Sequence, residues 1–274
     1  MIIMWRIDPN DKLCKCIFNL DDNTISSRCF QIIERYDTKK AEKLTTLVRF
    51  TSDSISKLSA YDREVAFACF SLFENHIPCT SIEQIYRTMI GSTKSRSTSS
   101  SEVMISNSLQ KLVSTYIAVE ISSLKKMGYC VDANSLNGQI LPAKVTTSNR
   151  HLKIEFLNES ILMTIAKIKN SQLITYPLEW LAVGGGNSPE RLTIRNYTLR
   201  RILECRLHPQ LTSTVTFKDI FEKQGLNNKG KCKKKRYRDY LLQCFGDWKK
   251  YSLITNFRLI CEVTGIHGIN FSTK

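Results

Sequence analysis

Apolar positions recur at a spacing of three and four residues in three successive stretches after residue 57, and this spacing is typical of amphipathic helices. Each stretch begins at a capping pattern, and the three patterns are Ser59–Asp62, Thr80–Glu83 and Ser99–Glu102. The first predicted helix runs to about Asn75, and the second ends at Gly91. β-branched residues then predict strands over 116–121, 139–145 and 152–156, with Asn137-Gly138 as a turn signal.

The same order of elements is predicted again beyond the glycine run Gly184–Gly186. Pro189 begins a helix that runs to about Leu207, and Thr216–Asp219 caps a second helix that ends at Gly225. A third helix is predicted from about Lys233, followed by a hairpin over 257–263 and 268–272. The halves also share a local pattern, because Ser81-Ile82-x-x-Ile85-Tyr86 matches Thr216-Phe217-x-x-Ile220-Phe221. Two copies of one unit explain the length better than a single large domain.

Three short helices followed by a β-hairpin is the order of a winged-helix domain, whose third helix is normally presented to the DNA major groove. We therefore predict an α+β protein with two tandem winged-helix domains, each a helix-turn-helix with a β-hairpin wing. The predicted boundaries are residues 58–183 for the first domain, 184–188 for a Gly-rich linker and 189–274 for the second. Residues 1–57 show only weak patterns, a strand over 13–20, a helix over 26–36 and a strand over 45–50.

Positive charge is concentrated in the last third of the chain. The formal net charge is +15, and residues 187–274 hold 18 Lys and Arg against 7 Asp and Glu. Seven of these cations lie between Lys229 and Arg238 with no acidic residue among them. A polyanionic partner, double-stranded DNA, is the simplest inference, and a basic surface without such a partner is the alternative.

The basic run opens the third helix of the second half. At one hundred degrees per residue the inner face is predicted to hold Tyr237, Leu241, Cys244, Phe245 and Trp248. The outer face would carry Lys235, Arg236, Asp239, Leu242, Gln243, Gly246 and Lys250. A solvated junction with charges for solubility is the alternative, and Asp239 and Leu242 favour it.

We predict DNA contacts for the basic residues of this segment and for Gln243. Lys235 or Arg236 would pair with guanine and Gln243 with adenine. Phosphate contacts are predicted near the helix start, where the helix dipole adds its positive end. The remaining DNA-binding residues predicted in this half are Lys229, Lys231, Lys233, Lys234, Arg238 and Lys250.

Two other groups of cations are weaker candidates. The loop before the third helix of the first half holds only Lys94 and Arg96 among serines, which suits either a phosphate contact or a mobile loop. If this half binds DNA weakly, its surface would serve dimerisation. The helix after Pro189 carries five arginines, for which a solvated face with a Glu204 ion pair is the favoured interpretation: Arg191, Arg195, Arg200, Arg201 and Arg206.

The sequence carries no motif for catalysis or for a cofactor. It has no phosphate-binding Gly-x-x-x-x-Gly-Lys-Ser/Thr pattern, no His-x-His pair, no Gly-x-Ser-x-Gly and no Cys-x-x-Cys. We expect a protein that is not an enzyme and has no metal, although scattered carboxylates leave a nuclease as an alternative. Ten cysteines without such a pattern, no secretory signal and no membrane-length apolar run predict a cytoplasmic protein with free thiols.

The tandem arrangement resembles the theta-type plasmid replication initiators, and it looks most similar to those on plasmids and integrative elements of Gram-positive bacteria. The resembling stretches lie between about residues 58 and 260: Leu58–Val65, Ile85–Gly91, Ile105–Leu109, Leu141–Lys144 and Tyr197–Ile202. The resemblance implies binding to repeated sites at an origin, melting of nearby duplex, recruitment of host replication proteins and a homodimer formed through the first domain. A transcriptional regulator with the same domains is the alternative.

Overall fold

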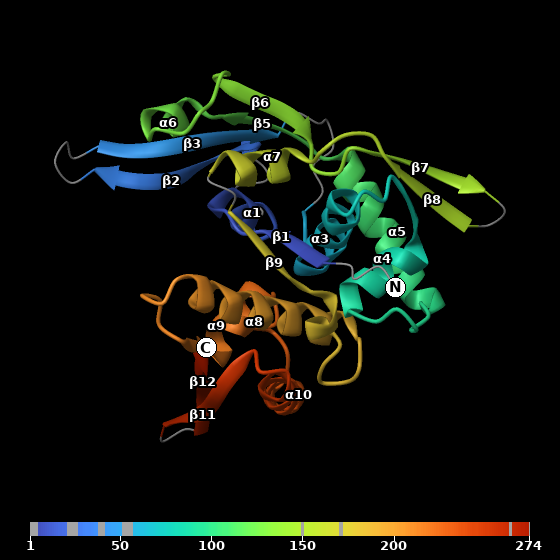
Figure 1. Ribbon diagram of the computed structural model, residues 1–274, viewed down its shortest axis with the longest axis vertical. Helices are drawn as coiled ribbons and strands as arrows, with labels where there is room; N and C mark the ends of the chain where they lie inside the picture. The colour runs from blue at the N-terminus through green and yellow to red at the C-terminus, as the bar shows by residue number, and fades with distance from the viewer. Residues whose placement is uncertain are drawn as a thin grey trace. The chain divides into compact units, whose positions relative to one another are not determined.

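A computed structural model describes residues 5–20, 27–37, 42–50, 57–148, 151–169, 172–262 and 265–273 (Figure 1). The chain divides into two compact units. Unit 1 comprises residues 1–5, 87–95 and 176–274, and unit 2 comprises residues 6–86 and 96–175. Both units mix helices with small antiparallel sheets, in agreement with the predicted α+β class.

The described residues between 6 and 50 belong to unit 2, and two of the weak sequence patterns in this region gave the wrong element. The range 13–20, predicted as a strand, overlaps helix α1 (Lys12–Ile17), which Asp11 caps and which buries Leu13 and Ile17. The range 26–36, predicted as a helix, overlaps strand β2 (Cys29–Asp37). β2 pairs with β3 (Glu42–Phe50), which confirms the strand predicted over 45–50. Backbone pairing therefore decides the structure of β2 over its local propensity.

The first three predicted helices correspond to α3 (Ala60–Glu74), α4 (Ile82–Ile90) and α5 (Ser99–Ser114). Strand β4 (Cys79–Ser81) lies between α3 and α4, and it pairs with the edge of a hairpin made by β7 (Ala143–Ser148) and β8 (His151–Phe156). The strand order of this sheet is β4-β8-β7. α3 packs along α5, and its buried Asp62 accepts a hydrogen bond from Ser108 of α5 at 2.6 Å.

Of the three capping patterns predicted in the first half of the chain, one agrees with the structure and two differ. Ser59 and Asp62 form the predicted capping box of α3. The third helix is capped one residue earlier than predicted, since Thr98 and Ser101 form its box in place of Ser99 and Glu102. Thr80 lies in strand β4, so α4 is instead supported by Ser81, whose hydroxyl accepts from Gln84 N.

An insertion separates α5 from the β7–β8 hairpin. It consists of β5 (Tyr116–Glu120), α6 (Ser122–Lys126) and β6 (Ser135–Gln139), and its strands extend the β2–β3 pair into a sheet of order β2-β3-β5-β6. Asn137 and Gly138 lie within β6 opposite Ala118 and Ile117, so the predicted turn at this pair is wrong. Helix α7 (Ile161–Ile168) and strand β9 (Leu173–Pro177) follow, and β9 forms a two-stranded sheet with β1 (Trp5–Pro9).

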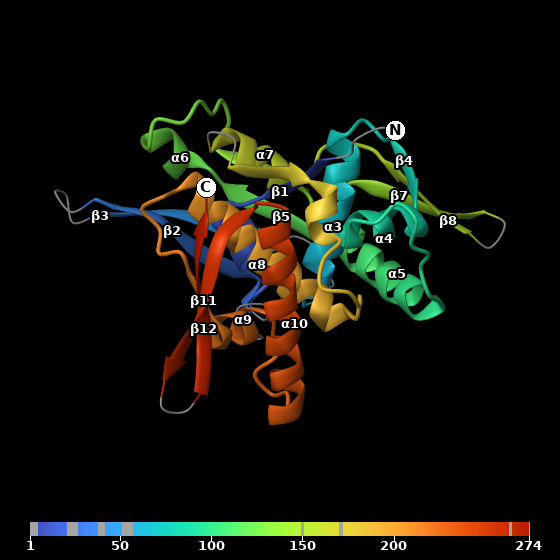
Figure 2. The ribbon, with the colours of Figure 1, turned by 60° about the horizontal axis from the view of Figure 1, so that its bottom comes forward.

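Unit 1 is built on the second predicted set of elements. These are α8 (Pro189–Leu207), β10 (Thr214–Thr216), α9 (Phe217–Lys223), α10 (Lys231–Lys250), β11 (Ile254–Glu262) and β12 (Gly265–Thr273). A short 3-10 helix, η1 (Leu178–Leu181), precedes the glycine run. The sheet order is β10-β12-β11. Figure 2 shows α10 along its length beside the β11–β12 hairpin.

The two sets follow one plan, apart from the insertion. Each runs helix, strand, helix, helix, strand, strand, and each sheet places its last strand in the middle. The local match seen in the sequence falls at the same junction, because Ser81 ends β4 before α4 and Thr216 ends β10 before α9.

Candidate nucleic-acid interface

Helix α10 is fixed in unit 1 by its apolar face. The five residues predicted to point inward, from Tyr237 to Trp248, are all buried, as is Tyr240. The Trp248 indole N–H donates to the carbonyl of Trp180 at 2.9 Å. Phe245 contacts three aromatic rings, those of Trp248, Phe257 and Phe271, and so ties α10 to both strands of the hairpin. The outer face of α10 is therefore held in one orientation.

The start of α10 differs from the starts of its neighbours. α8 and α9 begin at hydroxyl caps, Ser188 and Thr216, whereas α10 begins at Gly230 with no side-chain cap. Its first turn contains Lys231 and Lys233 and no acidic residue. Exposed backbone N–H groups, the positive end of the helix dipole and lysine ammonium groups thus gather at one point, an arrangement suited to a phosphate.

The predicted DNA-binding residues of α10 divide into two groups. Five are exposed on the outer face or at its end: Lys231, Lys233, Lys235, Arg236 and Gln243. Lys234 and Arg238 instead turn back over helix α9. Lys234 Nζ donates to the carbonyl of Asn227 at 2.6 Å and lies 5.9 Å from the Phe221 ring centre, and the Arg238 guanidinium lies 5.6 Å from that of Phe217. Cation–π contact of this kind joins α10 to α9.

Two further predicted cations have carboxylate partners. Lys229 Nζ lies 3.4 Å from Glu190 Oε1 at the start of α8. Lys250 is exposed and lies 3.1 Å from Asp247 Oδ1. Both pairs are partly exposed, so each contributes little to stability and leaves the cation able to exchange partners. Asp239 is exposed and Leu242 half-buried on the outer face, which leaves fewer side chains there that could pair with bases.

Several exposed cations of unit 1 were not predicted to bind DNA, among them Lys218 and Lys223 on α9, Lys249 on α10 and Arg258 on β11. All four lie outside the charge run that marked the start of α10, so that run gives no signal for them.

The glycine run packs against α10. The backbone N–H of Gly184 donates to Asp247 Oδ2 at 3.0 Å, and this bond lowers the pKa of the Asp247 carboxyl below its usual value. Gly184 has a φ of +74°, and a Cβ there would lie 2.4 Å from Cys244 Sγ. Only glycine fits this position, and the segment predicted as a Gly-rich linker is anchored at Gly184.

We expect Asp247→Asn to reduce the free energy of unfolding by about 1 kcal/mol at neutral pH, because it removes a charge-assisted hydrogen bond. The pKa of Asp247 in the folded state lies below its unfolded-state value of 3.8. The carboxylate therefore stabilises the fold at any pH above 3.8, and this stabilisation is lost as the pH falls through the folded-state pKa. The difference between wild type and Asp247→Asn should therefore shrink as the pH falls below the unfolded-state value of 3.8. Urea unfolding at several pH values measures it, and a constant difference would contradict the assignment.

The favoured interpretation of the α8 arginines is wrong for two of them. Arg195 is 1 % exposed and Arg200 is 7 % exposed, so neither lies on a solvated face. The guanidinium of Arg195 donates to Asn187 Oδ1 at 3.2 Å and to the Met89 carbonyl at 3.4 Å, which satisfies a buried charge within unit 1. The Glu204 ion pair is present, with Arg201 at 3.3 Å.

The serine-rich segment before α5 is hydrogen-bonded at several points. In unit 1 the Arg87 side chain donates to the Ser95 carbonyl at 3.0 Å, and Lys94 is exposed. In unit 2 Ser97 donates to Glu102 at 2.6 Å, and Arg96 is exposed. Both cations predicted in this segment are thus accessible, and Lys94 belongs to unit 1 whereas Arg96 belongs to unit 2.

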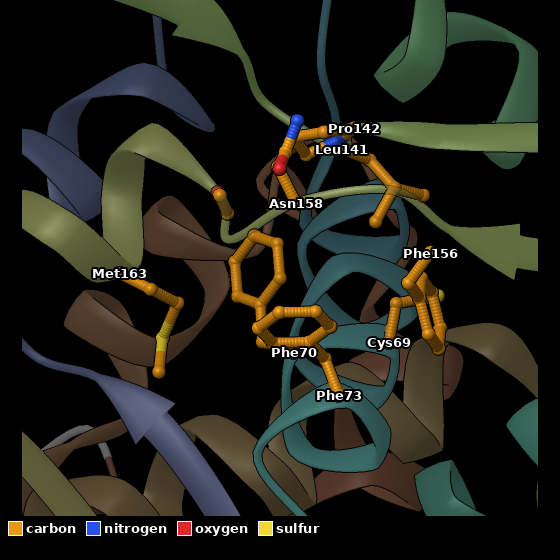
Figure 3. Close-up of a pocket in the computed structure, with 9 residues that line it drawn as sticks. Cys69, Phe70, Phe73, Leu141, Pro142, Phe156, Asn158 and Met163 are labelled. Carbon is orange, nitrogen blue, oxygen red and sulfur yellow. The ribbon is translucent and has the colours of Figure 1, made fainter. Parts of the chain in front are cut away.

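Unit 2 has a small apolar hollow between α3, α7 and the β7–β8 hairpin. Its free volume is about 10 Å³, enough for at most one water molecule. Figure 3 shows Phe70 and Phe73 at its centre, with Met163 to one side and Phe156 to the other. Burial raises the pKa of the adjoining Cys69 thiol to about 12, so this thiol is not a nucleophile at neutral pH.

Three other features bear on the chemistry of the chain. Within the described residues, no three His, Cys, Asp or Glu side chains are grouped as metal ligands would be. All ten cysteines are free thiols. None of the helices in the described ranges has the length and apolar character that crossing a membrane requires.

Comparisons with known proteins return similar solved structures, and two of them are of domains 2 and 3 of RctB. One has a TM-score of 0.44 and 11 % identity over 90 % of this chain and 92 % of that one. The other has a TM-score of 0.42 and 12 % identity over 84 % of this chain and 87 % of that one. Scores below 0.5 assign neither a fold family nor a function. No protein-family profile matches the chain, and no curated protein matches it.

Proposed function

We propose that this chain binds double-stranded DNA at specific sequences through two tandem winged-helix domains. The observation that carries the proposal is the basic start of α10, where exposed cations project from a helix whose opposite face is buried. A packed helix fixes the direction of its charges, which favours a phosphate backbone over a diffuse basic surface. The shared plan of the two sets of elements, helix-strand-helix-helix-strand-strand, supports the winged-helix assignment.

The proposed biological role is that of a replication initiator of a plasmid or mobile element, acting in the cytoplasm without catalysis or cofactor. The resemblance to theta-type initiators supports this role. On this proposal the chain binds repeated origin sites, forms a homodimer and recruits host replication proteins.

Footprinting of the full chain on the DNA around its own gene tests the proposal. We expect protection of several short direct repeats, with dissociation constants that rise steeply with salt. A single inverted repeat beside a promoter would instead identify a transcriptional regulator. Binding without sequence preference would refute both roles, and metal-dependent cleavage of the DNA would identify a nuclease.

A further inference from the structure

Helix α5 of unit 2 presents an exposed face without charge. Its buried side holds Ile105, Leu109 and Leu112. On the opposite side, residues at helical spacing form an exposed stripe, called here the α5 stripe: Ser99, Ser100, Val103, Asn107, Gln110 and Ser114. Val103 is 59 % exposed. The outer face of α10 carries several cations, whereas the α5 stripe has amides, hydroxyls and one aliphatic side chain.

The charged residues of α5 are engaged elsewhere. Glu102 accepts from the Ser97 hydroxyl at 2.6 Å, and Lys111 lies 3.4 Å from the buried carboxylate of Asp62. The side chains of Asn107 and Gln110, by contrast, make no hydrogen bond to any part of the chain that the structure describes. Two amides three residues apart on one helix face are neighbours, so both are available to a single partner.

We propose that the α5 stripe reads A·T base pairs in the DNA major groove. Asn and Gln side chains pair bidentately with the N6 and N7 edge of adenine, and an aliphatic group contacts the thymine methyl. Asn107 and Gln110 supply the amides, and Val103 supplies the aliphatic contact one turn earlier. This inference rests on the proposed DNA-binding function and names the residues of unit 2 that carry sequence preference.

DNA suits this face better than a protein partner does. Protein interfaces are enriched in aromatic residues, methionine and arginine at their centres, and none of these lies on the α5 stripe. Exposed cations, which phosphate binding would require, are nevertheless present in unit 2 beside α5. Arg96 is exposed just before its Thr98 cap, and Lys144 and Lys153 are exposed on the β7–β8 hairpin, which lies beside α5 in both views (Figures 1 and 2).

The two helices would then have different tasks. α10 supplies charge and hence affinity for any sequence, whereas α5 supplies hydrogen bonds to bases and hence preference. Changes in α10 should alter the salt dependence of binding, and changes in the α5 stripe should alter the preferred sequence alone.

The test uses the full chain and selection from a randomised DNA pool, followed by affinity measurements on the selected and a substituted site. We expect wild type to select a site with two or more A·T pairs. Asn107→Ala combined with Gln110→Ala should reduce the preference at one or two of these pairs by about five- to hundredfold while leaving non-specific affinity and the salt slope unchanged. Asn134→Ala, at an exposed asparagine before β6, is the matched control and should change nothing.

The outcomes separate the two proposals. If the double variant keeps the melting temperature and the full preference of wild type, the α5 assignment is wrong and the DNA-binding function stands. The assignment also fails if wild type selects no sequence, or if the double variant changes the oligomeric state, which would place a protein contact at the stripe. If wild type binds no DNA at all, the proposed function itself is refuted.

Discussion

Replacing Lys233, Lys235 and Arg236 together by Gln is expected to weaken DNA binding on the order of a hundredfold at about 0.15 M salt. Lys235 and Arg236 are exposed on the outer face of α10 and Lys233 is exposed in its first turn, and none of the three has a hydrogen bond or ion pair within the described residues. If each neutralises one phosphate, the slope of log affinity against log salt should fall by about 2.7, since each contact contributes about 0.9. Fluorescence anisotropy over a salt series measures both quantities.

The chain offers a matched control for this variant. Lys125, Lys126 and Arg206 are also exposed and unpaired in the described structure, and none of them lies on α10. Their replacement by Gln removes the same net charge, so it reports the general effect of a less basic protein. Equal slopes for the two triple variants would show that the outer face of α10 does not contact phosphate.

Arg6→Met is expected to reduce the free energy of unfolding by about 3 to 5 kcal/mol at neutral pH. Arg6 is fully buried, with its Nε 2.6 Å from Asp8 Oδ1 and its NH2 3.5 Å from Glu64 Oε2. Both carboxylates are also buried, and Arg63 approaches Glu64 at 3.3 Å. Removing Arg6 leaves the Asp8 carboxylate in the interior without this charge partner, which is the costly outcome for a buried pair.

The same substitution at a surface pair isolates the effect of burial. Arg49 lies 2.7 Å from Glu120, with about half of each side chain exposed (55 % and 45 %). Arg49→Met should therefore cost no more than about 1 kcal/mol. Urea unfolding of both variants provides the comparison, and a similar cost for the two would mean that the buried cluster is not held by charge.

Elements with a complete local signal were predicted from the sequence. The bounds of α8, the Thr216 cap of α9 and the buried face of α10 all follow from hydrophobic spacing and capping residues, because these depend on near neighbours in the chain. The inner face of α10 also fixes the outer face, so the exposed half of the candidate interface was predictable as well.

The predictions that failed concern residues whose structure depends on contacts with distant parts of the chain. β2 is a strand because it pairs with β3, and Asn137-Gly138 is extended because it pairs with β5. Arg195 looked like a surface charge, yet it is buried where the Met89 carbonyl and Asn187 accept its N–H groups. Lys234 and Arg238 were placed with the other cations, and the Phe221 and Phe217 rings draw them toward α9. No local pattern encodes these contacts.

The lysine-rich, uncapped start of α10 has a consequence for the unbound protein. Like charges gathered at the positive end of a helix dipole destabilise its first turn, and dissolved salt screens that repulsion. The same salt would lower the affinity of these lysines for DNA phosphates. If α10 binds phosphate as proposed, ionic strength acts in opposite senses on this one turn. Salt would stabilise the helix start of the free protein and destabilise the complex, and part of the binding energy of each phosphate would come from relieving the repulsion between neighbouring lysines.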